Sequence, residues 1–393
     1  MAALGTLDIL DRLVAYPTVS QDSNLPLIDW VRNYLADHGV DSHLVRNTTG
    51  DKSNLFATVG PLETGGIVLS GHTDVVPIDD QHWSSDPFNL TFNGSRFYGR
   101  GTCDMKGFIA VALSRVPVWQ ASKLRRPIHF MLSYDEELGC LGAPSMIEAA
   151  NKVLPTPTAV IVGEPTGMRI ATEHKGICML RTRVEGIEAH SSLTHEGHSA
   201  VMLAGQLIAH LGDLAQELAA NTNSDACRFT PPYTTLSVNR IEGGTASNIL
   251  AAACEFGWEI RSLPSDIPRR TLEKLSDFAE ARLGELLKEG KRCAIETEVL
   301  TEVPPLKADG GRAEDFVRSV GAPSKETIAV PFATEGGQFQ RMGWSTVVCG
   351  PGRIEQAHKP DEFIEHAELI ACEAFLDRVG VRQCRQAEEA GAK

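Results

Sequence analysis

Six acidic and imidazole side chains of this 393-residue chain have the types and positions of metal ligands. They are His72, Asp104, Glu136, Glu137, Glu164 and His358. Most of them lie in a short polar or Gly-rich break after an apolar stretch that is typical of a buried strand. Carboxylate oxygens and imidazole nitrogens suit Zn²⁺ or Co²⁺, and a carboxylate beyond those needed for binding can act as the base for a metal-bound water. The first interpretation is therefore a hydrolase with two metal ions.

The adjacent Glu136 and Glu137 follow the apolar run 127–135. If the strand continues through them, their side chains point in opposite directions. One would then bind the metal, and the other would take a proton from the bound water and return it to the leaving nitrogen. The alternative interpretation is a solvated acidic turn.

His72 and Asp74 alternate on an extended segment, so that His72 can bind a metal through one ring nitrogen while Asp74 orients it through the other. A polar turn at the end of a strand is the alternative. Asp104 follows Gly99-Arg-Gly101, which lacks the complete dinucleotide fingerprint. A carboxylate that bridges two metals fits better here, although an Asp before a helix is also typical of an N-cap.

Three polar positions stand out between residues 177 and 302, namely His190, Asn248 and Arg261. A guanidinium is suited to bidentate recognition of a substrate carboxylate, and a surface ion pair is the alternative for Arg261. His190 alone is more typical of a surface or core histidine.

The elements that must position these residues change in character along the chain. The first 175 or so residues alternate helical and strand patterns, which predicts an α/β unit whose sites gather beyond the carboxyl ends of its strands. Residues 177–302 follow the order strand, helix, strand, strand, helix, strand, which predicts a small inserted α+β domain. His358 lies near the C-terminus, so the chain must return to the first domain. The predicted domains are 1–176 with 303–393, and 177–302.

Composition limits the class of protein. Hydrophobic residues make up 42% and charged residues 22%, as in globular proteins, and no apolar run approaches the ~18 residues of a membrane span. The N-terminus lacks the features of a secretory signal, and the nine cysteines are scattered singly, which favours reduced thiols in the cytoplasm. A net charge of −14 argues against nucleic acid or an anionic membrane as a partner.

Taken together, these residues lie in motifs that resemble the M20 metallopeptidase family, and most closely its branch that deacetylates N2-acetyl-L-ornithine. The motifs span nearly the whole chain in the family's order. They include Ser70–Pro77, Tyr98–Gly107, Asp135–Glu137, Gly163–Thr166, Ala189–Ser192, Ala246–Asn248, Thr334–Glu335 and Gln356–Glu362.

The resemblance implies a fold and a site. It implies an α/β, zinc-peptidase-like catalytic domain with a central, mostly parallel sheet, and an inserted ferredoxin-like domain that forms a homodimer and a lid. It implies two zinc ions per subunit, which cobalt can replace. The implied roles are His72 and Glu164 for one metal, Glu137 and His358 for the other, Asp104 as the bridge, Glu136 as general base and Asp74 as the partner of His72.

The resemblance also implies how substrate is bound. His190 would stabilise the oxyanion in the partner subunit's site, and Asn248 and Arg261 would contact the substrate. A separate hypothesis, from the residue type and the acidic chain rather than from the resemblance, is that Glu335 pairs with the side-chain ammonium of ornithine. The implied reaction is hydrolysis of N2-acetyl-L-ornithine to L-ornithine and acetate, in arginine biosynthesis. The alternatives are deacylation of another N-acyl amino acid or dipeptide, such as succinyl-diaminopimelate, and a non-catalytic homologue that only binds. The presence of every ligand and of the base argues against the last.

Overall fold

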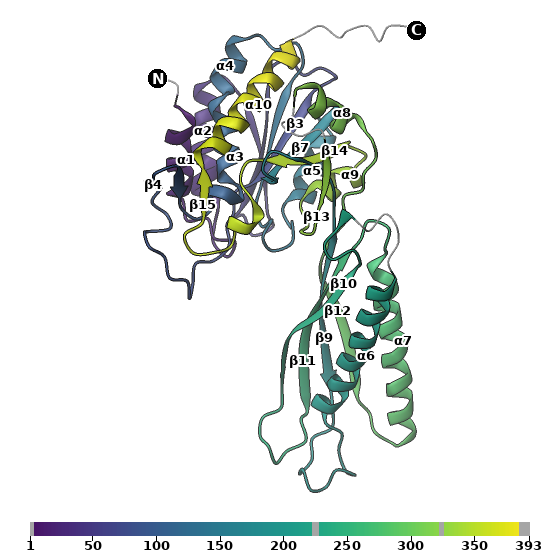
Figure 1. Cartoon of the computed structure of the whole chain (residues 1–393). Helices are drawn as coiled ribbons and strands as arrows, with labels where there is room; N and C mark the ends of the chain where they lie inside the picture. Colours follow the sequence, from purple (N-terminus) through teal and green to yellow (C-terminus); the bar gives the residue numbers. More distant parts are fainter. Residues whose placement is uncertain (1–3, 222–227, 322–325, 385–393) are drawn as a thin grey trace, which may run out of the picture. The chain divides into compact units, whose positions relative to one another are not determined.

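The computed structural model describes residues 4–221, 228–321 and 326–384, which form two compact units (Figure 1). The first unit comprises residues 1–173, 306–329 and 334–393, and the second comprises residues 174–305 and 330–333. The second unit is thus an insertion that interrupts the first.

An eight-stranded sheet forms the centre of the first unit, with the order β1-β2-β6-β3-β7-β14-β8-β13. Its strands are β1 (Ser42–Arg46), β2 (Ser53–Val59), β3 (Ile67–His72), β6 (Ile128–Ser133), β7 (Ala159–Pro165), β8 (Ile170–His174), β13 (Thr327–Val330) and β14 (Thr346–Gly350). The predicted α/β class is confirmed, but the sheet is mixed. Its middle strands, β6, β3, β7 and β14, are parallel, whereas β1–β2, β2–β6 and β14–β8 are antiparallel. The short connection 47–52 cannot make the crossover that a parallel β1–β2 pair would need.

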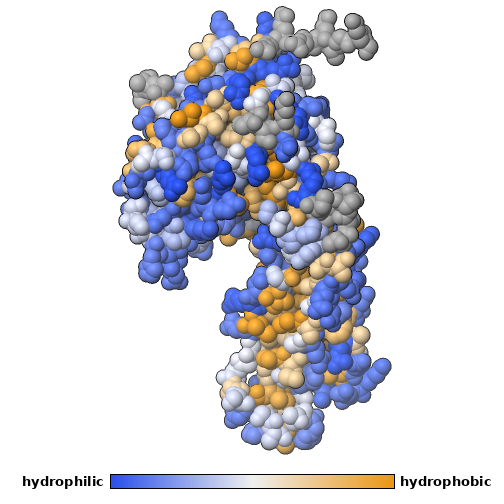
Figure 2. All heavy atoms as spheres, viewed as in Figure 1, coloured by the Kyte–Doolittle hydropathy of each residue, from blue (hydrophilic) through white to orange (hydrophobic). Residues whose placement is uncertain are grey.

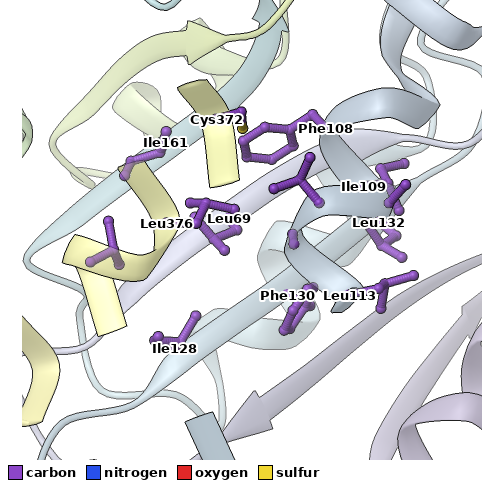
Figure 3. Close-up of a cluster of buried hydrophobic side chains, with 14 of the residues drawn as sticks. Leu69, Phe108, Ile109, Leu113, Ile128, Phe130, Leu132, Ile161, Cys372 and Leu376 are labelled. Atoms are coloured by element: carbon purple, nitrogen blue, oxygen red, sulfur yellow. The ribbon is translucent and has the colours of Figure 1, made fainter. Parts of the chain in front are cut away.

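Helices cover the sheet of the first unit. They are α1 (Thr6–Val14), α2 (Leu25–Asp37), α3 (Gly107–Ser114), α4 (Val116–Ala121), α5 (Ala143–Asn151), α8 (Arg312–Ser319), α9 (Gly336–Arg341) and α10 (His366–Cys384). Every residue of α3 is buried. Figure 3 shows Phe108, Ile109 and Leu113 of α3 packed with side chains of β3, β6, β7 and α10. This packing holds the start of α3, and the loop before it, against the central strands.

A small three-stranded sheet with the order β15-β5-β4 joins distant parts of the chain. It consists of β4 (Thr91–Asn93), β5 (Arg96–Tyr98) and β15 (Phe363–Glu365). β15 pairs antiparallel with β5, so that the segment before β15 lies beside the segment after β5. These two segments carry His358 and Asp104.

The second unit has the predicted order of elements. They are β9 (Gly176–Glu185), α6 (Ala200–Ala220), β10 (Thr235–Gly243), β11 (Ala253–Ser262), α7 (Pro268–Lys288) and β12 (Ala294–Val303). The antiparallel sheet order β10-β11-β9-β12 is that of a ferredoxin-like fold. Both helices cover the same face of the sheet (Figure 1). The strands β9 and β11 alternate buried and more exposed residues, as a sheet with one covered face requires.

The visible surface is mainly polar, with hydrophobic residues gathered over part of the second unit (Figure 2). The large exposed hydrophobic residues of this unit are Leu193, Val201, Met202, Ile241, Ile249, Ile267, Leu287, Val299 and Leu300. Across the three described ranges, no helix combines the length and the apolar character that crossing a membrane requires.

Candidate metal centre

Three central strands of the large sheet deliver candidate ligands to one edge. β3 ends at His72, and its register places His72 opposite Ser133, the last residue of β6. β7 pairs with the other side of β3 and carries Glu164 near its end. Because parallel strands bring their carboxyl ends to the same edge, the residues that follow them meet there.

Asp104 reaches this edge from the loop before α3. Asp104 and Met105 have non-helical backbone angles, and the peptide bond between them is cis. The helix begins only at Gly107, with Lys106 at its N-cap position, so Asp104 does not cap it. The N-cap interpretation is therefore excluded for this residue.

Asp104 lies between two histidines. Its Oδ1 is 3.0 Å from Nε2 of His72, and its Oδ2 is 3.2 Å from Nε2 of His358. Nε2 of His358 also lies 3.1 Å from Oε2 of Glu137, and Nε2 of His72 lies 3.7 Å from Oε1 of Glu164. The two carboxylate oxygens of Asp104 thus face different histidines, each of which has a second carboxylate beside it.

The Glu136–Glu137 pair lies in a turn, so the argument from strand alternation was wrong. β6 ends at Ser133, and Asp135 has a φ of 55°. The carboxylate of Asp74 holds this turn, because its Oδ1 accepts the N–H of Glu136 at 3.1 Å and its Oδ2 accepts the N–H of Glu137 at 3.2 Å. The side chain of Glu137 is only 8% exposed, which also excludes a solvated acidic turn.

Asp74 is in contact with His72 as well. Nδ1 of His72 is 2.9 Å from the backbone carbonyl oxygen of Asp74 and 3.5 Å from its Oδ1. Since a carbonyl oxygen can only accept, Nδ1 carries a proton, and Nε2 is the ring nitrogen that can bind a metal after it loses its own proton. The orientation predicted for His72 is present, and the closest contact is made by the backbone of Asp74.

The electrostatics of the site call for added positive charge. Burial raises the pKa of Glu136 to about 8, with further contributions from Glu137 and Asp104, against the effect of His72. Burial also raises the pKa of Glu164 well above its usual range, and its Oε1 is buried without a hydrogen-bond partner. A bound cation stabilises such carboxylates in their charged form.

The pKa values of the two histidines are raised as well, which favours their charged form. Burial alone would lower the pKa of His72, but hydrogen bonds to Asp104 and Asp74 raise it well above its usual value. Contacts with Asp104 and Glu137 raise the pKa of His358 to about 10. In the metal-free protein, the protonated rings of His72 and His358 supply the positive charge that bound metal ions would supply.

The donor atoms are close enough to share metal ions. Ligand atoms of His72, Glu136 and Glu164 lie within 4.8 Å of one another, and so do those of His72, Asp104 and Glu137. Imidazole and carboxylate donors in this arrangement fit Zn²⁺, and the orphaned oxygen of Glu164 supplies a ligand position that the protein itself leaves unused.

Some neighbours of the site carry no distinctive sequence signal. The thiol of Cys140 donates to Oε1 of Glu136 at 3.2 Å, and the carboxylate of Glu362 accepts the N–H of Asp104 at 3.1 Å. Both residues lie within or just after matching motifs, but nothing in the sequence pattern shows what they contact.

Glu335 lies in the interior of the first unit. It is 1% exposed, and its Oε2 accepts a hydrogen bond from Ser70 at 2.9 Å. Burial raises its pKa, and the hydrogen bond from Ser70 opposes this effect. Its pairing with a substrate ammonium stays a prediction.

The remaining predicted residues lie in the second unit. His190 and Asn248 are exposed and lie on adjoining loops, because the N–H of Ser191 donates to the carbonyl of Asn248 at 3.0 Å. Arg261 lies near the C-terminal end of β11, whereas Asn248 precedes the first residue of this strand. Nε of Arg261 lies 3.2 Å from Oε1 of Glu259. Arg261 thus forms the ion pair that was its alternative interpretation.

Comparison with known proteins finds relatives in both sequence and structure. The sequence pattern of peptidase family M20/M25/M40 matches residues 68–380. An acetylornithine deacetylase of Pasteurella multocida is 34% identical over 373 residues, which cover 93% of this chain and 94% of the relative.

Solved structures share the fold. The dipeptidase Dug1p of Saccharomyces cerevisiae superposes with a TM-score of 0.75 at 16% identity, over 98% of this chain and 96% of that one. The YXEP protein of Bacillus subtilis, described as a dinuclear metal-binding peptidase of family M20, superposes with a TM-score of 0.66 at 14% identity, over 96% and 97% of the two chains.

Proposed function

Because this chain belongs to peptidase family M20, whose members are metal-dependent hydrolases, we propose that it removes the acetyl group from N2-acetyl-L-ornithine. The products are L-ornithine and acetate, a step of arginine biosynthesis. One observation carries the hydrolytic part of the proposal: Asp104 lies between His72 and His358, with Glu137 and Glu164 beside them. Four relatives that are 34–35% identical to this chain are acetylornithine deacetylases, which supports the choice of substrate.

The residues present fit two zinc ions. His72 and Glu164 would hold one, Glu137 and His358 would hold the other, and Asp104 would bridge them. When bound, such a pair polarises the amide carbonyl and makes water a stronger acid at neutral pH. Cobalt has similar ligand preferences and is expected to substitute.

Glu136 is the general base in this proposal. Its carboxylate takes a proton from water as the water oxygen attacks the carbonyl carbon, and it gives the proton to the nitrogen as the C–N bond breaks. Asp74 keeps Glu136 and Glu137 in place through their backbone N–H groups. The thiol of Cys140 holds one oxygen of the base.

Substrate contacts from the second unit complete the proposal. An imidazole donor from His190 of the partner subunit would stabilise the oxyanion, and such donors contribute roughly 3 kcal/mol in comparable sites. Asn248 and Arg261 would contact the substrate, and Arg261 would have to exchange its contact with Glu259 for one with a carboxylate.

A homodimer in the cytoplasm is part of the same proposal. The exposed hydrophobic residues of the second unit, including Met202 at 67% and Ile241 at 52% exposure, offer apolar area for contact between two copies. The eight described cysteines are all free thiols, as a reducing compartment favours. Sedimentation of the purified protein measures the assembly directly, and a monomer at micromolar concentration would contradict it.

The deciding experiment is a panel of substrates with the Zn²⁺- or Co²⁺-loaded enzyme. The panel contains N2-acetyl-L-ornithine, acetyl-methionine, succinyl-diaminopimelate and a dipeptide, and Glu136→Gln serves as the inactive control. We expect the highest kcat/KM with acetylornithine, and at least a hundredfold loss in Glu136→Gln with metal content unchanged. A preference for another acyl group would support the hydrolase activity but contradict acetylornithine as the substrate. Near-normal turnover by Glu136→Gln would contradict the role of Glu136 as general base.

A further inference from the structure

A buried ion pair, Arg100 with Glu362, lies beside the candidate metal centre, and neither residue is one of its proposed ligands. Nη1 of Arg100 is 2.8 Å from Oε2 of Glu362, and each side chain is 1% exposed. A buried pair of charges is costly unless its remaining hydrogen-bonding capacity is used. The other hydrogen-bond partners of Arg100 and Glu362 therefore indicate the role of the pair.

Glu362 holds the loop that carries Asp104. Its Oε2 also accepts the N–H of Gly101 at 3.0 Å, and its Oε1 accepts the N–H groups of Cys103 at 2.9 Å and Asp104 at 3.1 Å. Its own backbone carbonyl accepts the N–H of Gly99 at 2.9 Å. Both carboxylate oxygens are thus occupied by the backbone on which Asp104 sits.

Arg100 holds the segment that carries His358. Its Nη1 reaches the carbonyl of Lys359 at 3.4 Å, and its Nη2 donates to Oε1 of Gln81 at 2.6 Å. Nε2 of Gln81 in turn donates to the carbonyl of His358 at 3.4 Å. The one ion pair therefore connects the backbone of the Asp104 loop to the backbone around His358.

The other half of the centre is held in a different way. His72 and Glu164 lie on β3 and β7, where the central sheet fixes them, and both are at most 5% exposed as side chains. His358 lies outside regular structure with a φ of 60°, and its side chain is 50% exposed. Its position depends on the contacts of its loop.

We propose that the Arg100–Glu362 pair is a positioning unit that sets the distance between Asp104 and His358, and that it thereby controls the affinity for the second of two metal ions. This inference rests on the proposed dimetal centre. The cation held by His72 and Glu164 shares Asp104 with the second ion but takes its other two ligands from the sheet, so it is expected to depend less on the pair.

The test is Glu362→Gln in the full-length protein, with the metal-free protein titrated with Zn²⁺ against a competing chelator and the bound metal counted by mass spectrometry. A glutamine has only one acceptor oxygen. It can accept either from Cys103 and Asp104 or from Arg100 and Gly101, and its NH₂ group then faces the other two donors. We expect the Zn²⁺ at Glu137 and His358, which is the second equivalent, to bind about 10- to 100-fold more weakly. The first equivalent, at His72 and Glu164, should be weakened several-fold less.

A matched control lies in the small sheet β15-β5-β4, next to the segments that carry Arg100 and Glu362. Arg96 and Glu365 form an ion pair of the same 2.8 Å length, but their side chains are 45% and 29% exposed. Glu365→Gln is expected to leave both equivalents of Zn²⁺ unchanged. Arg100→Lys is the second test variant, because it keeps the charge, loses the fork that reaches Gln81, and should reproduce the selective loss.

The outcomes separate this inference from the proposed function. A wild-type protein that binds fewer than two equivalents of Zn²⁺ would contradict the dimetal centre itself. Two equivalents in the wild type, with unchanged affinities in folded Glu362→Gln or Arg100→Lys, would overturn the positioning role. Equal weakening of both equivalents would overturn its selectivity. If Glu362→Gln does not fold, the same criteria apply to Arg100→Lys.

Discussion

Gly163→Ala tests how tightly the candidate ligand Glu164 is built into the core. A Cβ added at Gly163 would lie 2.1 Å from both Cδ1 and Cγ of Phe108, and 2.5 Å from its Cε1. The ordinary contact between carbon atoms is ~3.5 Å, so the overlap is about 1.4 Å. Figure 3 shows Phe108 enclosed by the side chains of neighbouring elements.

Neither partner has room to move. Phe108 is 2% exposed and belongs to α3, all of whose residues are buried, and Gly163 lies inside β7 between two paired strands. Overpacking of a core costs 1–3 kcal/mol and sometimes more, so we expect a loss of about 3 kcal/mol in the free energy of unfolding. The midpoint of thermal unfolding should fall by roughly 4–6 °C. Zinc affinity should fall as well, because Glu164 must shift with its strand.

The assay is urea and thermal unfolding of the metal-free protein, with Gly257→Ala as the matched control. Gly257 also lies within a strand, β11, but a Cβ added there meets nothing within 4 Å. That variant should be neutral or more stable by about 0.4–1 kcal/mol. In a Phe108→Ala background, most of the cost of Gly163→Ala should disappear. A Gly163→Ala protein within about 0.5 kcal/mol of the wild type would refute the reasoning.

Three further predictions follow from single contacts. Asp74→Asn loses an acceptor for the N–H of Glu136 or Glu137, so kcat/KM should fall about 100-fold with the fold intact by circular dichroism. Cys140→Ala should lower kcat and leave KM unchanged, and Cys140→Ser should restore it; equal rates in all three proteins would exclude the thiol contact as relevant. Burial lowers the pKa of His129 from 6.5 to about 4, so unfolding takes up a proton between these values. The contribution of neutral His129 to the free energy of unfolding should be fully present above pH 6.5 and should be lost, by about 3 kcal/mol, as the pH falls to 4. Urea unfolding of His129→Leu at each pH should show a smaller loss over this range.

The sequence by itself determined the main elements and the ligand types. Periodicity identified the alternating strands and helices of the first unit and the order of the second, because side chains repeat every two residues in strands and every 3.6 in helices. Parallel strands must end at one edge, so His72 and Glu164 could be expected together before any contact was known. The Gln356–Glu362 motif, through the family resemblance, also led to His358.

Only the tertiary structure decided how those ligands are held and where the other predicted residues lie. It placed Glu136 and Glu137 in a turn held by Asp74, and it turned Glu335 into the protein. It also joined Glu362 to Asp104, which are 258 positions apart in the chain. Local periodicity reports which face of an element is buried. It does not report which donor from a distant segment meets a given carboxylate, because that depends on the packing of the whole sheet and its loops.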